Sequence, residues 1–543
     1  MIQSLKFFGS PFMLHCLVIV GALLGALAFS YDVLWWLIFL SPTPLLVSIY
    51  NEGVLNKRLF FLCLLWGTIF FGGVLWWLWH TLPLNWLGVT DPALQRIAIL
   101  LYWGTISLFL GIFPALWGLS ARFLFTKTPF DILLFPSLWI LFEYARSWAF
   151  SLFAYGEGTI VGGHWSVGVL GYALAEHAFL RSFASLGGVY LLSFIVVGVT
   201  STVSWILLRG HGALRGKVVL LGGLVAFVAL STFFAPFSVG IKQNHEHSLR
   251  VAVMQTNFPP GFQGKIGETR NFLALESLVA QIRKAGENPD IIIFPEDSLF
   301  LQSLLPKEGA GYFFNTILGE KERLIIDSGS VRDTSSSMHL RMYYFNTKTG
   351  DMPTQDKQLL VPQGEYRPFF YQIIEKAAGK SALFDRLAER HSYARGFSME
   401  TGEVAGVRVG GLFCSDVMSP ILYREMAQKS PGVFVNVASH SWFHNSKLME
   451  KQSKNMGSIR AAEHGRPFIR SGNGTISLVL NENGAVIAET ASVGNAVLFA
   501  TTTPTTGATP YTRFGDLILF MALVISISGK LFFYFKKRPA PAL

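Results

Sequence analysis

The chain has 543 residues, which is more than one small domain needs. Its apolar fraction is 51% and its charged fraction 14%, whereas an average soluble protein has about 25% charged residues. This composition indicates a membrane protein. The net charge is +10, but the basic residues form no stripe and no nucleic-acid-binding motif, so nucleic acid is not an expected partner.

Long apolar runs occupy the first half of the chain and recur near its end. A membrane-spanning helix needs about 20 mostly apolar residues. Pro42 and Pro44 lie inside the second run, so we expect that span to kink or re-enter the membrane. Residues 26–28 also fit a signal-peptide cleavage site, but the weakly charged start, with Lys6 alone, favours a retained helix. The eight predicted spans are residues 12–29, 33–50, 59–79, 96–118, 130–150, 184–208, 217–239 and 515–534.

Basic residues gather at four sites that lie between or after these spans. If the eight spans alternate in direction, all four sites fall on one side of the membrane, which is the cytoplasmic side by the positive-inside rule. The intervening loop 80–95 carries almost no Lys or Arg. The large polar region after the seventh span is therefore expected outside the cytoplasm. The basic residues are Lys57, Arg58, Arg122, Lys127, Arg209, Arg215, Lys217, Lys536, Lys537 and Arg538.

The segment 151–182 is too long for a simple turn and is rich in Gly, Trp and Phe. Trp148 and Trp165 lie near its ends. Two interpretations stay open: an aromatic belt at the membrane interface, or a wall of a site that faces lipid.

Residues 245–512 have the composition of a soluble domain. Short apolar strands alternate there with amphipathic helices, which predicts a layered α/β domain. We therefore divide the chain into a membrane domain (1–244), an extramembrane catalytic domain (245–512), and a closing span with a basic tail (513–543). The predicted strands are 251–254, 291–294, 324–326, 342–345, 404–413 (broken at Gly410-Gly411), 433–437, 476–480 and 485–487, and the predicted helix is 268–285, with Phe272, Leu275, Leu278, Val279 and Ile282 on one face.

Three residues at or near strand ends combine into a possible acyl-transfer site. Cys414 follows the strand that ends at Phe413, Glu296 follows the strand 291–294, and Lys357 precedes another short apolar run. A thiol can attack a carbonyl to form a thioester. A carboxylate can carry the proton, and a fixed ammonium can stabilise the oxyanion. This chemistry needs no metal and no cofactor, and no zinc-type spacing of ligands is present.

Each of these residues also has an ordinary structural interpretation. A lone Cys at a strand end is more often a core residue, as we expect of Cys16 and Cys63 within the apolar runs. Glu296 could cap a helix, and Lys357 could be a solvated loop charge. His440 and His444 flank an aromatic pair and also invite a catalytic role, but a loop near the membrane surface is the preferred interpretation.

The local sequences around the three residues resemble the nitrilase, or carbon-nitrogen hydrolase, superfamily. These sequences are Phe-Pro-Glu ending at Glu296, Lys-Gln-Leu-Leu-Val-Pro-Gln-Gly-Glu-Tyr starting at Lys357, and Gly-Leu-Phe-Cys ending at Cys414. The second is especially similar to the apolipoprotein N-acyltransferases, as is Arg-Ala-Ala-Glu-His-Gly-Arg-Pro starting at Arg460, together with Arg470. The order of spans and polar domain is also similar to that family.

The resemblance implies an αββα sandwich and a ping-pong acyl transfer through a thioester on Cys414. Glu296 would be the general base, Lys357 the oxyanion stabiliser, and Glu365 and Asp416 supporting carboxylates. A membrane phospholipid would donate the acyl chain, and the amino group of a diacylglyceryl-cysteine at an apolipoprotein N-terminus would accept it. The enzyme would be a monomer in the bacterial inner membrane, with its catalytic domain on the periplasmic side.

Some positions depart from the family pattern. Ser415 and Asp416 replace the usual aromatic residue and Glu after the nucleophile, and Ser439-His440-Ser441 replaces the usual Asn-Asp pair and small residue. Trp442 and Phe443 follow, and we expect them to contact acyl chains. Two alternatives remain: a membrane-bound amidase or hydrolase, in which water resolves the thioester, and a non-catalytic protein that binds lipoproteins.

Overall fold

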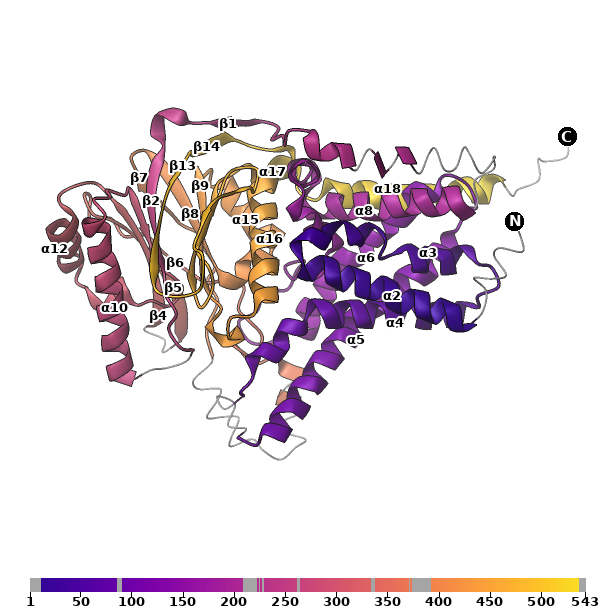
Figure 1. Cartoon of the computed structure of the whole chain (residues 1–543), viewed down its shortest axis with the longest axis horizontal. Coiled ribbons are helices and arrows are strands. Elements are labelled where there is room, and N and C mark those ends of the chain that lie inside the picture. The colour runs from indigo at the N-terminus through magenta and orange to yellow at the C-terminus, as the bar shows by residue number, and fades with distance from the viewer. Residues whose placement is uncertain are drawn as a thin grey trace.

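The computed structural model of the chain has two parts, a bundle of apolar helices and a layered α/β region (Figure 1). The structure describes residues 11–84, 90–208, 222–223, 225–226, 229–260, 264–333, 337–370, 372–373 and 392–536.

The helical part contains all but one of the predicted spans as helices. The span predicted at 217–239 lies partly outside the described residues, and its described end holds a short 3-10 helix, Ser231–Phe233. The apolar residues of this part form one continuous core, which includes Trp66, Trp117 and Tyr172. The long helices are α2 (Pro11–Ser30), α3 (Thr43–Tyr50), α4 (Asn56–Val74), α5 (Pro92–Leu124), α6 (Asp131–Phe153), α8 (Ala184–Leu208) and α18 (Leu517–Lys536).

Among the described residues, five segments are long and apolar enough to cross a membrane: Phe12–Ser30, Asp32–Tyr50, Asn56–Val74, Pro92–Leu124 and Ala184–Leu208. The second is broken, as the prolines predicted, into a 3-10 helix (Asp32–Phe39) and α3. Helix α6 is outside this set; it buries Asp131, Glu143 and Arg146 in the bundle. The total of eight spans stays a prediction.

Arg122 and Lys127, two of the basic residues used to predict the topology, contact loops at one end of the bundle. Arg122 donates hydrogen bonds to the carbonyl oxygens of Ser48 and Asn51, both at 2.8 Å. Lys127 pairs with Glu52 at 2.8 Å. The loops after α3 and α5 therefore lie at the same end, as alternating spans require. Arg209, Arg215, Lys217, Lys537 and Arg538, and the side chain of Lys536, lie outside the described residues.

Two six-stranded sheets form the α/β region. Both mix parallel and antiparallel neighbours: β8, β9 and β10 run parallel in one sheet, and β2, β3 and β4 run parallel in the other. The first sheet has the order β12 (Val486–Glu489), β11 (Leu478–Leu480), β10 (Phe468–Asn473), β9 (Val433–Ser439), β8 (Val407–Phe413), β7 (Thr401–Val404). The second has the order β13 (Ala496–Thr502), β2 (Leu249–Gln255), β3 (Ile291–Ile293), β4 (Leu324–Arg332), β5 (Met338–Asn346), β6 (Thr354–Asp356).

The two sheets face each other and helices cover their outer faces, which gives the predicted αββα layering (Figure 1). Alternate residues such as Val253, Ile293 and Val435 fill the space between the sheets. The outer helices are α10 (Gly264–Lys284), α11 (Phe300–Ser303), α12 (Lys307–Leu318), α15 (Pro420–Gln428) and α16 (Lys447–His464), and the remaining short elements are α7 (Ala178–Ser182), α17 (Pro510–Phe514), and β1 (Ile241–Gln243) paired with β14 (Thr505–Gly507).

One predicted break in the sheet is misplaced. The chain turns between β7 and β8 at Ala405 and Gly406, both with positive φ, and Val404 pairs with Val407 across this two-residue turn. Gly410 and Gly411 instead lie inside β8. A side chain on Gly410 would collide with Met426 of α15, and one on Gly411 with Met342 of the opposite sheet. These glycines therefore permit close packing on both faces of the strand, rather than a turn.

The segment 151–182 packs between the bundle and the sandwich. His164 Nδ1 lies 2.8 Å from Ser419 Oγ, and Ser166 Oγ donates to the carbonyl oxygen of Met418 at 2.5 Å. Trp165 is buried, so it does not belong to an exposed aromatic belt, whereas Trp148 is 40% exposed and the interpretation stays open for it. The segment instead supports residues that directly follow Cys414 in the chain.

Candidate active site

The two sheets bring the three predicted catalytic residues to one place. Glu296 lies in the loop after β3, and Lys357 directly follows β6 of the same sheet. Cys414 begins a short 3-10 helix, Cys414–Met418, directly after β8 of the facing sheet. The site therefore forms between the sheets, at the ends of strands from both.

Lys357 is the centre of a buried ionic cluster. Its Nζ lies 2.9 Å from Glu296 Oε1 and 2.6 Å from Glu365 Oε1, and its side chain is 1% exposed. The second oxygen of Glu365 accepts the Val361 backbone N–H at 2.8 Å. A buried ammonium between two carboxylates is stable only when such hydrogen bonds satisfy the group. The cluster therefore holds Lys357 charged and in one orientation.

The main chain of Ser439, at the end of β9, links the acid to the nucleophile. The Ser439 N–H donates to Glu296 Oε2 at 3.1 Å, and the Ser439 carbonyl oxygen lies 3.8 Å from Cys414 Sγ. Cys414 is partly exposed, whereas Glu296 and Lys357 are buried. The thiol is thus the member of the cluster that a substrate can reach.

The charges of the cluster set the protonation of its members. Burial raises the pKa of Glu296 to about 7, although Lys357 opposes the shift. Burial disfavours the charge of Lys357, but Glu296 and Glu365 outweigh it and raise the pKa of Lys357 well above its ordinary value. Burial, with Glu296 beside it, raises the pKa of Cys414 to about 12. The resting thiol is therefore protonated, and its attack on a carbonyl requires a base to take the proton.

A base that titrates near the working pH can both take and return a proton, so the raised pKa of Glu296 suits it to that proton transfer, which stays a prediction. Lys357 is within electrostatic range of Cys414, and stabilisation of an oxyanion by its fixed positive charge stays a prediction. The site thus brings together a thiol, a carboxylate and an ammonium, which are the groups that thioester chemistry requires.

The two predicted supporting carboxylates have different contacts. Glu365 pairs with Lys357 directly. Asp416 instead accepts the backbone N–H groups of Phe413 at 2.8 Å and Leu359 at 3.3 Å, and burial raises its pKa to about 7. Asp416 therefore braces the turn that carries Cys414 against the segment that follows Lys357.

The sequence did not single out Asn436, in the middle of β9. Its Nδ2 donates to the carbonyl oxygen of Phe413 at 2.9 Å, which fixes the peptide that precedes Cys414. Its Oδ1 lies 3.4 Å from Nε of Arg470, which is fully buried. A single Asn within an otherwise apolar strand was the available signal, because a buried amide must find partners.

The predicted acyl-chain contacts and the two histidines lie in the loop after β9. Phe443 packs edge-on against Trp77 of the bundle, with ring centroids 5.1 Å apart, while a contact of Trp442 or Phe443 with an acyl chain stays a prediction. His444 is exposed, and its ring lies 2.8 Å from the carbonyl oxygen of His80. His440 is 3% exposed, and the position of this loop near the membrane surface stays a prediction.

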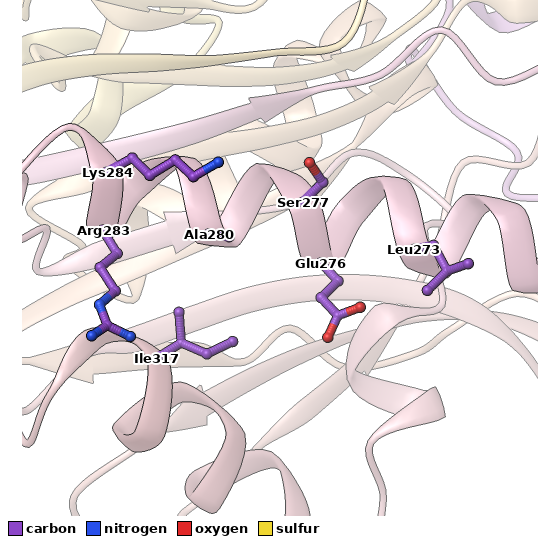
Figure 2. A pocket seen from close by; sticks show the side chains of 7 residues that line it. All are labelled: Leu273, Glu276, Ser277, Ala280, Arg283, Lys284 and Ile317. Atoms are coloured by element: carbon purple, nitrogen blue, oxygen red, sulfur yellow. The ribbon is translucent and has the colours of Figure 1, made fainter.

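A shallow hollow lies along α10, on the side of the sandwich away from the membrane bundle (Figures 1 and 2). The hollow lies on the helix face turned away from the sheets and contains none of the residues of the Glu296–Lys357–Cys414 cluster. Its lining residues are Leu273, Glu276, Ser277, Ala280, Arg283, Lys284 and Ile317.

The fold and the site together define a membrane protein whose α/β domain is of the carbon-nitrogen hydrolase class. Residues 250–511 match the family model for carbon-nitrogen hydrolase, and residues 21–202 match that for the apolipoprotein N-acyltransferase N-terminal domain. The chain belongs to the apolipoprotein N-acyltransferase family.

Relatives match over almost their whole length. The apolipoprotein N-acyltransferase of Shewanella oneidensis is 26% identical, and the match covers 94% of each chain. That of Vibrio vulnificus is 25% identical, again over 94% of each chain. Among solved structures, a carbon-nitrogen hydrolase from Helicobacter pylori G27 has 15% identity and a TM-score of 0.34, covering 54% of this chain and 96% of its own.

Proposed function

We propose that this N-acyltransferase moves a fatty acyl chain from a membrane phospholipid to the α-amino group of a lipid-modified N-terminal cysteine of lipoproteins. The observation that carries the proposal is the position of Cys414: a partly exposed thiol beside a buried Glu296–Lys357 pair, on a domain that packs against apolar helices.

In the first half-reaction, Cys414 Sγ attacks the carbonyl carbon of the phospholipid ester. Glu296 takes the thiol proton, and Lys357 stabilises the oxyanion. The bond from carbon to the glycerol oxygen then breaks, and Glu296 returns the proton to that oxygen. The products are a lysophospholipid and a thioester on Cys414.

In the second half-reaction, the acceptor amine attacks the thioester carbonyl. The carbon–sulfur bond breaks, the amine loses a proton through Glu296, and Cys414 regains its thiol. If water attacked instead, the protein would be a hydrolase. Both substrates are anchored in a bilayer, and extracting an acyl chain from it costs about 0.8 kcal/mol per methylene. A domain packed on membrane helices avoids that cost.

Several further properties belong to the proposal. The protein crosses the bacterial inner membrane several times, and the loops after α3 and α5 lie in the cytoplasm because Arg122 and Lys127 are there. The catalytic domain, at the opposite end of the bundle, lies in the periplasm. The domain boundaries are 1–244, 245–512 and 513–543, and the protein acts as a monomer.

Intact mass spectrometry after incubation with phospholipid vesicles tests the proposal. We expect an added acyl mass that hydroxylamine removes and that is absent from Cys414→Ala. Adding a synthetic diacylglyceryl-cysteine peptide should discharge the adduct and yield the N-acylated peptide. Folded protein that gains no acyl mass would overturn the proposal, and discharge to free fatty acid alone would favour the hydrolase.

A further inference from the structure

His440 is a buried polar residue in the loop after β9. Among the described residues, neither of its ring nitrogens has a hydrogen-bond partner, although the residue is only 3% exposed. A neutral imidazole carries one donor and one acceptor, and leaving both unpaired in the interior costs free energy. An unpartnered buried group at a catalytic site points to a ligand that completes it.

The main chain holds His440 in a fixed position beside the reacting groups. It directly follows Ser439, whose N–H binds Glu296 and whose carbonyl oxygen lies next to Cys414 Sγ. The His440 N–H donates to the Asn473 carbonyl oxygen at 2.8 Å, and the His440 carbonyl oxygen accepts from Phe443 at 2.9 Å. These bonds hold the backbone of His440 directly after the peptide that contacts Glu296 and Cys414.

His440 also contacts the aromatic residue through which this loop meets the membrane bundle. Its ring packs edge-on against Phe443, with centroids 6.0 Å apart, and Phe443 packs against Trp77 of the bundle. The Arg470 guanidinium is within electrostatic range of both His440 and Cys414. His440 and the thiol thus share the buried Arg470 guanidinium as an electrostatic neighbour.

The site supplies hydrogen-bond donors to a carbonyl oxygen, but few free acceptors. Lys357 offers its ammonium to a developing oxyanion. The two oxygens of Glu296 already accept from Lys357 and from Ser439. An attacking amine needs an acceptor for the N–H that it does not transfer, so that its lone pair points at the carbonyl carbon. A neutral imidazole lone pair meets that need.

We propose that His440 is a substrate-contacting residue that accepts a hydrogen bond from the α-amino group of the acceptor and orients the amine toward the Cys414 thioester. This inference rests on the proposed function. The bond forms from the amine nitrogen to the thioester carbon as the carbon–sulfur bond breaks. One amine proton passes through Glu296 to Cys414, and the other stays on the product amide. Burial and Arg470 lower the pKa of His440 to about 3, so the imidazole stays neutral and acts as an acceptor.

Separate measurement of the two half-reactions tests the inference. Wild type, His440→Phe, His440→Asn and the control His444→Phe are loaded from phosphatidylethanolamine vesicles, and adduct formation is followed by intact mass. Donor is then removed, and a synthetic diacylglyceryl-cysteine peptide is added. We expect His440→Phe to load within about threefold of wild type but to discharge about tenfold or more slowly, as for the loss of one buried hydrogen bond.

The remaining variants separate a contact from a structural role. His440→Asn, which is smaller and polar, should show the same slow discharge and serves if the Phe variant does not fold, as judged by thermal unfolding. His444→Phe should load and discharge like wild type. Discharge of both His440 variants at the wild-type rate, or equal slowing of loading and discharge, would overturn the inference. Wild type that never loads would overturn the proposed function, and this inference with it.

Discussion

Helices α10 and α16 cover opposite outer faces of the same sandwich, but they have different surroundings (Figure 1). Helix α10 buries one apolar stripe, including Leu275 and Val279, and exposes its other side. Helix α16 is polar in composition, yet residues 451–464 are buried except Lys454, which is half-buried. The difference arises because α16 lies between the sheet and the membrane bundle.

This comparison shows how the protein couples its two parts. The charged residues of α16 find partners in the bundle: Arg460 donates to the Tyr172 hydroxyl at 2.7 Å, and Glu463 accepts the Val189 N–H at 2.9 Å. Cys414 and Arg470 are on the sheet that α16 covers. The α16 side therefore carries both the nucleophile and the contacts with the membrane helices, and changes there should outweigh changes on the α10 side.

The largest effect is expected from removal of the nucleophile. Cys414→Ala should lower acyl transfer by at least about a thousandfold, because no thioester is able to form. The measurement is product formation from labelled phospholipid and a lipopeptide. Cys63→Ala, in the core of the bundle, is the matched control and should keep the chemistry of the site. Transfer by Cys414→Ala at a tenth of the wild-type rate would contradict the assignment.

Breaking the buried ionic cluster should affect both activity and stability. Lys357→Met leaves Glu296 and Glu365 without their shared cation, which we expect to cost about 3–5 kcal/mol of unfolding free energy and to slow loading by about a hundredfold or more. Lys321→Met, which breaks the partly exposed pair with Asp290 (2.6 Å), should cost about 1 kcal/mol or less. Similar losses of stability in the two variants would contradict the argument.

The ion pairs within α16 provide an internal comparison. Arg460 and Glu463 lie 2.7 Å apart with both side chains fully buried, whereas Lys447 and Glu450 lie 3.1 Å apart with the lysine side chain 74% exposed. Arg460→Met should reduce the free energy of unfolding by about 3–5 kcal/mol, and Lys447→Ala by about 0.5 kcal/mol. Thermal or chemical unfolding in detergent measures both.

Loading should depend on pH through Glu296. Because this base must be ionised to take the thiol proton, and burial raises its pKa to about 7, the rate of adduct formation should rise as pH increases through about 7 and level off above it. Asp416 has a pKa raised to a similar value, so Asp416→Asn is the control and should keep this acid limb. A rate that falls with increasing pH over this range would contradict the role of Glu296.

The smallest effects are expected in the hollow along α10 (Figure 2). Glu276→Ala and Arg283→Ala should each change the free energy of unfolding by no more than about 0.5 kcal/mol and should leave loading and discharge unchanged. Unfolding in detergent measures the stability of these variants, and intact mass spectrometry measures their loading and discharge. A large loss of transfer here would show that the α10 side takes part in the function.

The sequence alone determined the division into apolar helices and an α/β domain, because hydropathy and strand–helix alternation are local patterns. The motifs around Glu296, Lys357 and Cys414 also predicted a shared site, since each lies in a short characteristic stretch, and their catalytic roles stay a prediction. The strands predicted at 476–480 and 485–487 correspond to β11 and β12, which pair antiparallel across the turn at 481–484.

Only the tertiary structure decided which polar residues are buried and what they contact. The sequence of α16 resembles a surface helix, and its burial depends on two partners that are distant along the chain. Gly410 packs against Met426 on one face of β8, and Gly411 packs against Met342 on the other. These contacts require both layers of the sandwich. The burial of His440 also depends on distant partners. Its ring nitrogens lack hydrogen-bond partners in the described part of the chain because of how β9, Phe443 and the membrane bundle pack, which no local pattern encodes.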